Sequence, residues 1–533
     1  MGAMTTGAGR LVETDRVVIV GAGVGALFAA LSLAPRPVLV ISPERVGRGA
    51  SSAWAQGGVA AAVGPDDTPE RHATDTIRVG AGIVDAAAAR AIAAAAPRVI
   101  DRLAALGIPF DRTGEGRFAL SREAAHSRAR IVRVKGDGSG AAIMAALTDR
   151  VRATPSIALL EEAMAIGLEA DDEGAVLALQ HAGRGHSAPL LLRAPAVLLA
   201  GGGSGGLYAL TTNPPRIRGE VIGLAARAGA LIADPEFIQF HPTALDLGED
   251  PAPLATEALR GEGAVLVDRE GRRFMAEVHP DAELAPRDVV ARAVFREWAA
   301  GRRPMLDARR AVGAAIHERF PRVAAACMRH GIDPAKEPMP VAPAAHYHMG
   351  GVATDIDGRS SLAGVWAIGE CASTGLHGGN RLASNGLLEA LVQAEMAAAD
   401  IARTLRGLSL PAPVPPLRFE GTGSPPDAAA LARLRQIMSR HVGVVRTAEG
   451  LETALEAISA IEARHGASPE MANICATARL IATAALLRRE SRGAHFRADF
   501  PAPDPAWAHR TRLTLEEARA HAAAAASTAE SAP

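Results

Sequence analysis

A glycine-rich turn between two short apolar runs near the N-terminus constrains the fold most. Residues 17–20 are Val-Val-Ile-Val, a β-branched run that predicts a fully buried strand. Residues 21–26 fit G-x-G-x-x-G/A, and a second apolar run at 38–41 completes a strand–helix–strand unit. Gly21 permits the tight turn, and Gly23 lets the backbone approach a pyrophosphate at the start of the helix. We therefore expect a dinucleotide to bind here.

The residues after the second apolar run argue against NAD as the dinucleotide that binds here. An NAD-binding unit places an acidic residue there to hold a ribose hydroxyl. In this chain Ile41 is followed by Ser42 and Pro43, and Glu44 comes a little late.

Length and charge narrow the class of protein. The chain has 533 residues, too many for one core, so two or three domains are expected. Hydrophobic residues make up 48% of the chain, which is enough for globular packing. The formal net charge is −1, so no basic excess indicates a nucleic-acid partner.

The cysteines and the hydropathy pattern indicate the cellular compartment and whether metal sites, disulfides or membrane-spanning helices are expected. Cys327, Cys371 and Cys475 are odd in number and widely spaced, so they predict no disulfide framework, zinc site or iron–sulfur cluster. This usage suits a reducing cytoplasm. No uncharged apolar run of about 18 residues occurs, so we predict neither a membrane-spanning helix nor a membrane partner.

Three further runs carry a resemblance to a known family. Residues 51–58 combine small residues with paired glycines, which lets backbone N–H groups approach a flat polar ring. Residues 196–208 form an apolar run that ends in a glycine loop, and residues 374–389 are glycine-rich with one arginine. In this order, over almost the whole chain, the runs resemble the succinate dehydrogenase/fumarate reductase flavoprotein family.

The resemblance implies an α/β fold in several domains. It predicts a Rossmann-like FAD-binding domain in two parts, an inserted α+β capping domain and a C-terminal helical domain. The expected boundaries are 14–237 and 346–408 for the FAD-binding domain, 238–345 for the capping domain and 427–521 for the helical domain. Two local expectations come from the residues themselves: a helical region at 86–106 that is broken near Pro97, and helix throughout 428–521.

FAD is the expected cofactor. Family members with covalent flavin carry a histidine where this chain has Ser51, so FAD is expected to bind without a covalent bond. Glu370 would reach a ribityl hydroxyl, and Glu220 stands where the family usually has aspartate. The full set of expected FAD contacts is Ala22, Gly23, Val24, Gly25, Ser42, Ser51, Ser52, Ala53, Trp54, Ala55, Gln56, Gly57, Gly58, Ala163, Glu220, Glu370, Gly386 and Leu387.

A dicarboxylate substrate needs cations at both ends, and arginine binds carboxylates through two parallel hydrogen bonds. The resemblance implies that the carboxylate ligands are His241, Thr256, His346 and Arg381. A buried structural histidine is the alternative for His346, since His348 two residues on shows that histidine density proves little.

Oxidation at carbon also needs a group that removes a proton. The resemblance assigns this task to Arg287, whose guanidinium has a pKa above ~12 and so needs a relay and exclusion of water. Glu257 and Arg260 match that relay. They are three residues apart, and an exposed ion pair on one helical turn is the alternative.

Residues 121–130 contain the run R-E-x-x-H-S. In an arbitrary protein such a polar, charged run would be a surface loop. Here it resembles the family members that act on L-aspartate, and Glu123 would supply a negative charge to the substrate ammonium.

The resemblance thus implies oxidation of L-aspartate to iminoaspartate, with the reduced FAD reoxidised by oxygen or fumarate. This is the first step of NAD biosynthesis through quinolinate, and quinolinate synthase uses the product. A soluble fumarate reductase or succinate dehydrogenase flavoprotein subunit is the alternative. A flavin-binding scaffold without turnover is a third possibility, against which Arg287, His241, His346 and Arg381 argue.

Overall fold

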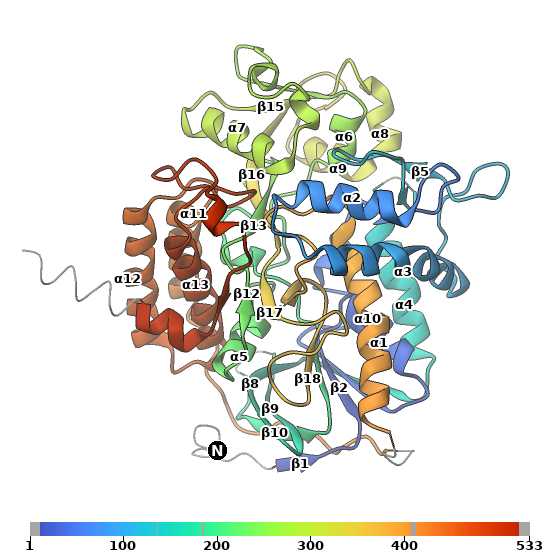
Figure 1. Ribbon diagram of the computed structural model, residues 1–533, viewed down its shortest axis with the longest axis vertical. Coiled ribbons are helices and arrows are strands. Elements are labelled where there is room, and N and C mark those ends of the chain that lie inside the picture. Colours follow the sequence, from blue (N-terminus) through green and yellow to red (C-terminus); the bar gives the residue numbers. More distant parts are fainter. Residues whose placement is uncertain (1–10, 136, 184–185, 407–411, 522–533) are drawn as a thin grey trace, which may run out of the picture.

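The computed structural model describes residues 11–135, 137–183, 186–406 and 412–521. Figure 1 shows three regions: a sheet with helices in the lower half, a separate group of strands and helices above it, and a bundle of helices at one side. The expected α/β class is confirmed.

A five-stranded parallel sheet lies at the centre of the lower half. Its order is β18-β11-β2-β3-β7. Every residue of β2 and β3 is buried, which explains their unbroken apolar sequences. The strands are β2 (Val17–Val20), β3 (Val38–Ser42), β7 (Ile157–Glu161), β11 (Val197–Leu199) and β18 (Val365–Ala367).

Four helices share an apolar core with this sheet, on the right in Figure 1. They are α1 (Val24–Leu33), α3 (Ala86–Ala105), α4 (Ser139–Arg152) and α10 (Asn385–Thr404). Helix α2 (Pro69–Val79) packs on α3, and three short strands pair nearby: β4 (Val59–Ala60), β5 (Leu120–Ser121) and β6 (Ile131–Val132).

A second apolar core joins the sheet to another four-stranded sheet and to helix α5. The order of this sheet is β1-β10-β9-β8. Its elements are β1 (Leu11–Glu13), β8 (Ala163–Asp171), β9 (Gly174–His181), β10 (Leu190–Ala194) and α5 (Glu220–Arg227). A further small sheet contains β12 (Ile232–Ala233), β17 (Gly351–Ala353), β19 (Ala372–Ser373) and β20 (Arg512–Leu513).

The upper region of Figure 1 has its own apolar core. Its antiparallel sheet has the order β13-β16-β15-β14. The strands are β13 (Ile238–Leu245), β14 (Val265–Val267), β15 (Met305–Asp307) and β16 (Met339–His348), and the helices are α6 (Glu257–Gly261), α7 (Arg287–Ala299), α8 (Ile316–Arg319) and α9 (Pro321–Arg329). This region corresponds to the expected capping domain, although β16 runs three residues past 345. The domain limits stay a prediction, and the limit at 408 lies outside the described residues.

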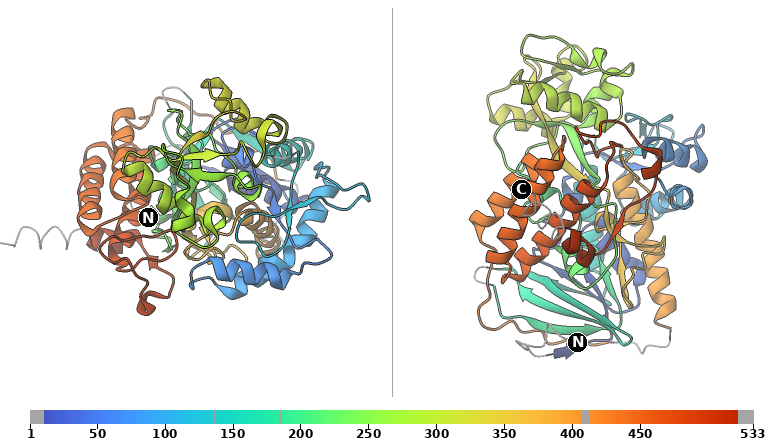
Figure 2. Two further views of the ribbon diagram at one scale, coloured as in Figure 1. Left: turned by 90° about the horizontal axis from the view of Figure 1, so that it is seen from above. Right: turned by 60° about the vertical axis from the view of Figure 1, so that its left-hand side comes forward.

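Three helices near the C-terminus form the bundle, seen from the front on the right of Figure 2. They are α11 (Ala428–His441), α12 (Ala448–His465) and α13 (Pro469–Leu487). Helix α13 is long and apolar enough to cross a membrane, yet 89% of its most apolar window is buried inside the protein. It lies so close to α5 that a Cβ on Gly223 would be 1.9 Å from the Asn473 carbonyl oxygen. We therefore interpret α13 as a core helix.

Two local expectations were wrong. Helix α3 continues through Pro97, which costs one backbone hydrogen bond but meets only small alanines in the preceding turn. Residues 488–513 form no α-helix and only one short 3-10 turn, Pro505–Trp507. Buried arginines bond backbone carbonyls there instead: Arg488 donates to Trp507 and His509, and Arg497 donates to Ala485 and Leu486.

Candidate active site

A cavity of about 770 Å³ runs from the glycine-rich turn after β2 to the strands and helices of the upper region. Every residue that the sequence analysis assigned to FAD lines it, from Ala22 to Leu387. The expected carboxylate ligands, Glu123, Glu257 and Arg287 line it as well. Arg260 is not among the lining residues and lies behind Glu257.

The glycine turn is shaped by close backbone contacts. Gly21 has φ +114°, and a Cβ there would lie 2.2 Å from the Ala200 carbonyl oxygen. A Cβ on Gly203 would lie 2.2 Å from the Glu370 carboxylate. Only glycine fits at these two positions, which lets the backbone pack closely where a pyrophosphate and a ribityl chain are expected.

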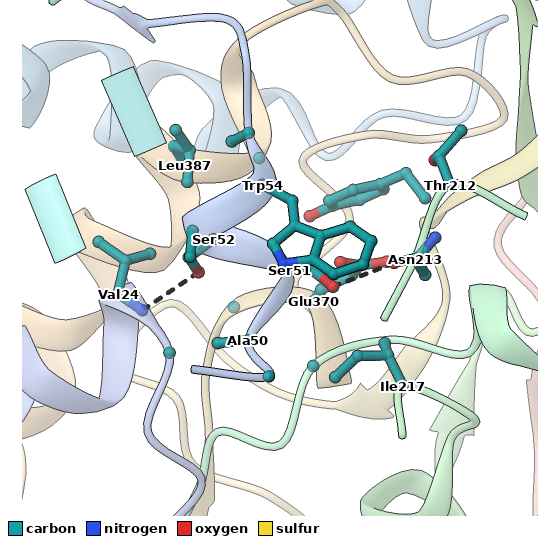
Figure 3. A pocket seen from close by; sticks show the side chains of 18 of the residues that line it. Val24, Ala50, Ser51, Ser52, Trp54, Thr212, Asn213, Ile217, Glu370 and Leu387 are labelled. Carbon is teal, nitrogen blue, oxygen red and sulfur yellow. Dashed lines mark hydrogen bonds between the residues drawn. The ribbon is translucent and has the colours of Figure 1, made fainter. Parts of the chain in front are cut away.

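Serines 51 and 52 fix the segment that follows β3. The Val24 backbone N–H at the start of α1 donates to Ser52 Oγ over 3.2 Å, and Ser51 Oγ donates to Asn213 Oδ1 over 3.1 Å (Figure 3). Both serines are thus engaged with the protein. No histidine stands at position 51, where covalent members of the family attach the flavin.

Two carboxylates near the glycine loops differ in their partners. Glu370 is partly buried and accepts one hydrogen bond from the His348 backbone N–H over 2.9 Å, and desolvation raises its pKa to about 7. It can therefore take a hydroxyl partner at low energetic cost. The Glu220 carboxylate already accepts from Arg218 N and Nε, at 3.0 and 2.8 Å, so any contact with FAD would be shared with that arginine.

At the other end of the cavity, one buried amide joins two arginines. Gln239 Oε1 accepts from Arg287 Nη1 and from Arg381 Nη2, each over 3.0 Å. Gln239 Nε2 donates to the Arg381 carbonyl oxygen over 2.9 Å, which fixes the orientation of the amide. Arg287 also forms a two-point ion pair with Glu257. The two guanidinium groups are thus held side by side.

The relay expected behind Arg287 is buried. Arg260 Nη2 lies 3.8 Å from Glu257 Oε1, and neither side chain is more than 4% exposed. This rules out the alternative of an exposed ion pair. Burial acts to raise the pKa of Glu257, but Arg287 and Arg260 outweigh it and lower that pKa. Glu257 therefore stays charged between the two arginines.

Two of the histidines lie together and a third does not. The rings of His241 and His346 are 5.0 Å apart, and burial followed by the charges of nearby arginines lowers the pKa of both well below the ordinary value. His346 Nδ1 lies 2.8 Å from Thr212 Oγ1. His348 instead bonds Ser204 and the Pro235 carbonyl oxygen away from the cavity. Of these two histidines, His346 lines the cavity and His348 does not.

Glu123 reaches the same end of the cavity from another segment. It is 8% exposed, and its Oε2 accepts from Ser384 Oγ over 2.8 Å. Burial and then the charge of Glu257 raise its pKa, while Arg287 opposes the shift. A solvated loop charge would show none of these features.

Buried ion pairs hold the segment that carries Glu123. Arg130 is fully buried and bonds Asp67 and Asp75, each over 2.7 Å. His126 Nε2 lies 3.0 Å from the Ala383 carbonyl oxygen, next to Ser384. These contacts anchor the run R-E-x-x-H-S, of which Glu123 lines the cavity.

The comparisons with known proteins agree with this geometry. The family model described as "FAD binding domain" matches residues 16–387, and the model described as "Fumarate reductase flavoprotein C-term" matches residues 465–528. An L-aspartate oxidase of Caulobacter vibrioides is 55% identical, and the match covers 94% of this chain and 96% of that protein. The chain belongs to the L-aspartate oxidase family. A member from Streptomyces coelicolor is 45% identical, with 91% and 88% of the two chains covered.

Solved structures place this L-aspartate oxidase family member among the succinate dehydrogenase and fumarate reductase flavoproteins. The FrdA chain of E. coli quinol fumarate reductase has a TM-score of 0.81 at 27% identity, and 93% of each chain is covered. Mycobacterium smegmatis Sdh1 has a TM-score of 0.79 at 29% identity, with 95% of this chain and 94% of that chain covered. The expected cofactor is confirmed as FAD.

The sequence analysis missed two residues that organise the site. It gave no role to Gln239, although it lies two residues before His241 in one strand, a spacing that places side chains on one face. It also missed Ser384, which has φ +60° and begins helix α10 beside Glu123. No pattern in the sequence indicated that contact.

Proposed function

We propose that this protein oxidises L-aspartate to iminoaspartate with FAD as the electron acceptor. The reaction removes a hydride from the carbon that bears nitrogen and a proton from the substrate. FAD, when bound, supplies the hydride acceptor. The residues of the chain bind the dicarboxylate, exclude water and accept the proton.

Binding of the two carboxylates is assigned to four residues. Thr256 caps helix α6, and Thr256 and Arg381 both line the cavity near the Arg287–Glu257 pair. His241 Nδ1 accepts from the Thr243 backbone N–H, so the neutral ring carries its proton on Nε2 and donates it to a substrate oxygen. His346 lies against His241 and supplies a second neutral ring at that end.

Arg287 is the proposed proton shuttle: it releases one proton into the relay before it takes one from the substrate. Its ion pair with Glu257 and its bond to Gln239 fix it at the N-terminus of α7, at the edge of the cavity. Glu257 and Arg260 continue the line away from the substrate, which gives the proton a route through buried groups. This relay stays a prediction.

Glu123 is the observation that carries the proposal for L-aspartate over succinate. The two diacids share both carboxylates and differ at C2, where L-aspartate bears an ammonium group. A site made only of arginines and histidines would repel that cation. Glu123 places a buried carboxylate beside Arg287 and Arg381, and the ammonium would neutralise it.

One experiment separates this proposal from a succinate dehydrogenase or fumarate reductase. L-Aspartate and succinate are each added to the FAD-loaded protein without oxygen, and the flavin absorbance is followed. We expect L-aspartate to bleach the flavin rapidly and succinate to leave it oxidised. Bleaching by succinate alone would refute the proposal, and bleaching by neither would favour a scaffold without turnover.

The physiological setting follows from the same assignment. We propose that oxygen or fumarate reoxidises the flavin and that quinolinate synthase consumes the unstable product in NAD biosynthesis. The three free, buried cysteines are consistent with a cytoplasmic enzyme.

A further inference from the structure

Arg381 is held differently from its neighbour Arg287. Arg287 pairs with Glu257, whereas no carboxylate in the described parts of the chain forms an ion pair with Arg381. Arg381 Nη2 donates to Gln239, its Nε is buried without a partner, and its guanidinium carbon lies 4.3 Å from the centre of the Tyr347 ring. An aromatic face attracts a cation without neutralising it. The charge of Arg381 therefore remains free for a substrate carboxylate.

Contacts with three further residues fix the Tyr347 ring, which also lines the cavity. A Cβ on Gly386, in the first turn of α10, would lie 2.7 Å from Tyr347 Cε2. The hydroxyl of Tyr347 donates to Glu389 Oε2 over 3.3 Å and lies 3.1 Å from His377 Nε2. The His377 ring meets the tyrosine ring edge-on, with centres 5.1 Å apart. The ring cannot turn away from Arg381 without breaking these contacts.

Glu389 anchors this group inside the core. Its carboxylate accepts from Thr374 Oγ1 over 2.8 Å and lies 2.7 Å from His377 Nε2, and it is 2% exposed. Burial and then the charge of Glu389 raise the pKa of Tyr347 well above its ordinary value, so the phenol stays neutral and remains a donor. None of these side chains has a task in the proposed reaction.

We propose that Tyr347, held in place by His377 and Glu389, is a positioning residue that presents Arg381 to the substrate carboxylate. The inference rests on the proposed function only in taking Arg381 as a dicarboxylate ligand. The same ring supports the first turn of α10, where Gly386 and Leu387 are expected to meet FAD.

Three variants of the FAD-loaded, full-length protein test this role. Tyr347→Leu removes the ring, Tyr347→Phe removes only the hydroxyl, and Tyr208→Phe is the matched control. Tyr208 is the other of the two tyrosines in the chain. It is buried, donates to the Val442 carbonyl oxygen over 3.3 Å and does not line the cavity. The readouts are retained FAD, the Kd for succinate from the flavin absorbance change, and KM and kcat with L-aspartate.

We expect Tyr347→Leu to raise the Kd for succinate and the KM for L-aspartate about tenfold, because the cation loses its aromatic face. The value of kcat and the amount of bound FAD should change little. Tyr347→Phe, which keeps the ring, should raise both constants less, and Tyr208→Phe should leave them unchanged. Unchanged constants in Tyr347→Leu, or loss of FAD from both Tyr347 variants, would overturn the inference.

A double-mutant cycle shows whether Tyr347 acts through Arg381. The succinate Kd is measured for Tyr347→Leu in the wild-type and Arg381→Lys backgrounds. We expect the effect of Tyr347→Leu to shrink to about twofold or less when Arg381 is replaced, since coupled residues are not additive. Equal effects in both backgrounds would assign Tyr347 a role independent of Arg381.

The succinate measurements also separate this inference from the proposed function. They need only the binding of a dicarboxylate and no turnover. A wild-type flavin that L-aspartate does not bleach would refute the proposed function while the succinate constants still decide the role of Tyr347.

Discussion

In the proposed function, a single carboxylate, Glu123, distinguishes L-aspartate from succinate. Glu123→Gln keeps the shape of the side chain and removes its charge. Because an unpaired buried charge costs roughly 2–5 kcal/mol, kcat/KM for L-aspartate should fall about 30-fold or more. Reduction of fumarate by the reduced enzyme, which involves no ammonium group, should change little. Equal losses with both substrates would mark Glu123 as structural.

The raised pKa of Glu123 predicts a pH dependence. The carboxylate must be ionised to receive the ammonium group, so kcat/KM for L-aspartate should fall as the pH drops through this pKa, which lies above the ordinary value for glutamate. His241 and His346 do not confuse the profile, because burial lowers both of their pKa values. The acidic limb should be absent from Glu123→Gln, and a limb that persists there would belong to another group.

The role of Arg287 can be tested by its removal. Arg287→Leu should keep FAD and much of the dicarboxylate binding, since Gln239 and Arg381 remain. The turnover number should fall at least ~10²–10⁴-fold, the usual worth of general acid–base catalysis. The test is to measure kcat with L-aspartate and the FAD content of the purified variant. Near-native turnover would leave Arg287 with a structural role only.

At the scale of the elements, buried ion pairs hold the segment that carries Glu123. Arg130→Gln should leave Asp67 as a buried charge without its arginine partner and Asp75 with only Arg78 as a cationic partner, a loss of about 3–5 kcal/mol. We expect a lower thermal unfolding midpoint and a weaker preference for L-aspartate, with the flavin still bound. Arg78→Gln is a suitable control, because Arg78 bonds the same Asp75 but is 60% exposed. A similar loss in the control would show that burial is not the cause.

Sequence patterns predicted those elements whose own residues determine their form. Strands β2 and β3 and the glycine turn between them follow from an apolar run and a motif. The structure of residues 488–513 could not be predicted in this way. It depends on hydrogen bonds from Arg488 and Arg497 to backbone carbonyls that only the folded chain brings close. The same reason hides Ser384: its contact with Glu123 joins residues 261 positions apart.

For the whole molecule, the FAD cavity is built from segments that span residues 20–390. Ser51 stands where a covalent link would form, so acid precipitation should leave the yellow colour in the supernatant. Removal of FAD should also lower the thermal unfolding midpoint, since a ligand at 100 times its Kd contributes about 2.7 kcal/mol. Flavin retained in the washed pellet would contradict the non-covalent assignment.

Glu123 and Arg287 line one cavity from different stretches of the chain. The first belongs to a loop at residues 121–130 that is clamped by Asp67, Asp75 and Ala383, and the second to the strand-and-helix region above it. The residues proposed for substrate choice and those proposed for acid–base chemistry are therefore encoded by separate segments of the sequence. Substitutions in the loop at residues 121–130 could change which diacid binds, while Arg287 and its proton relay stay the same.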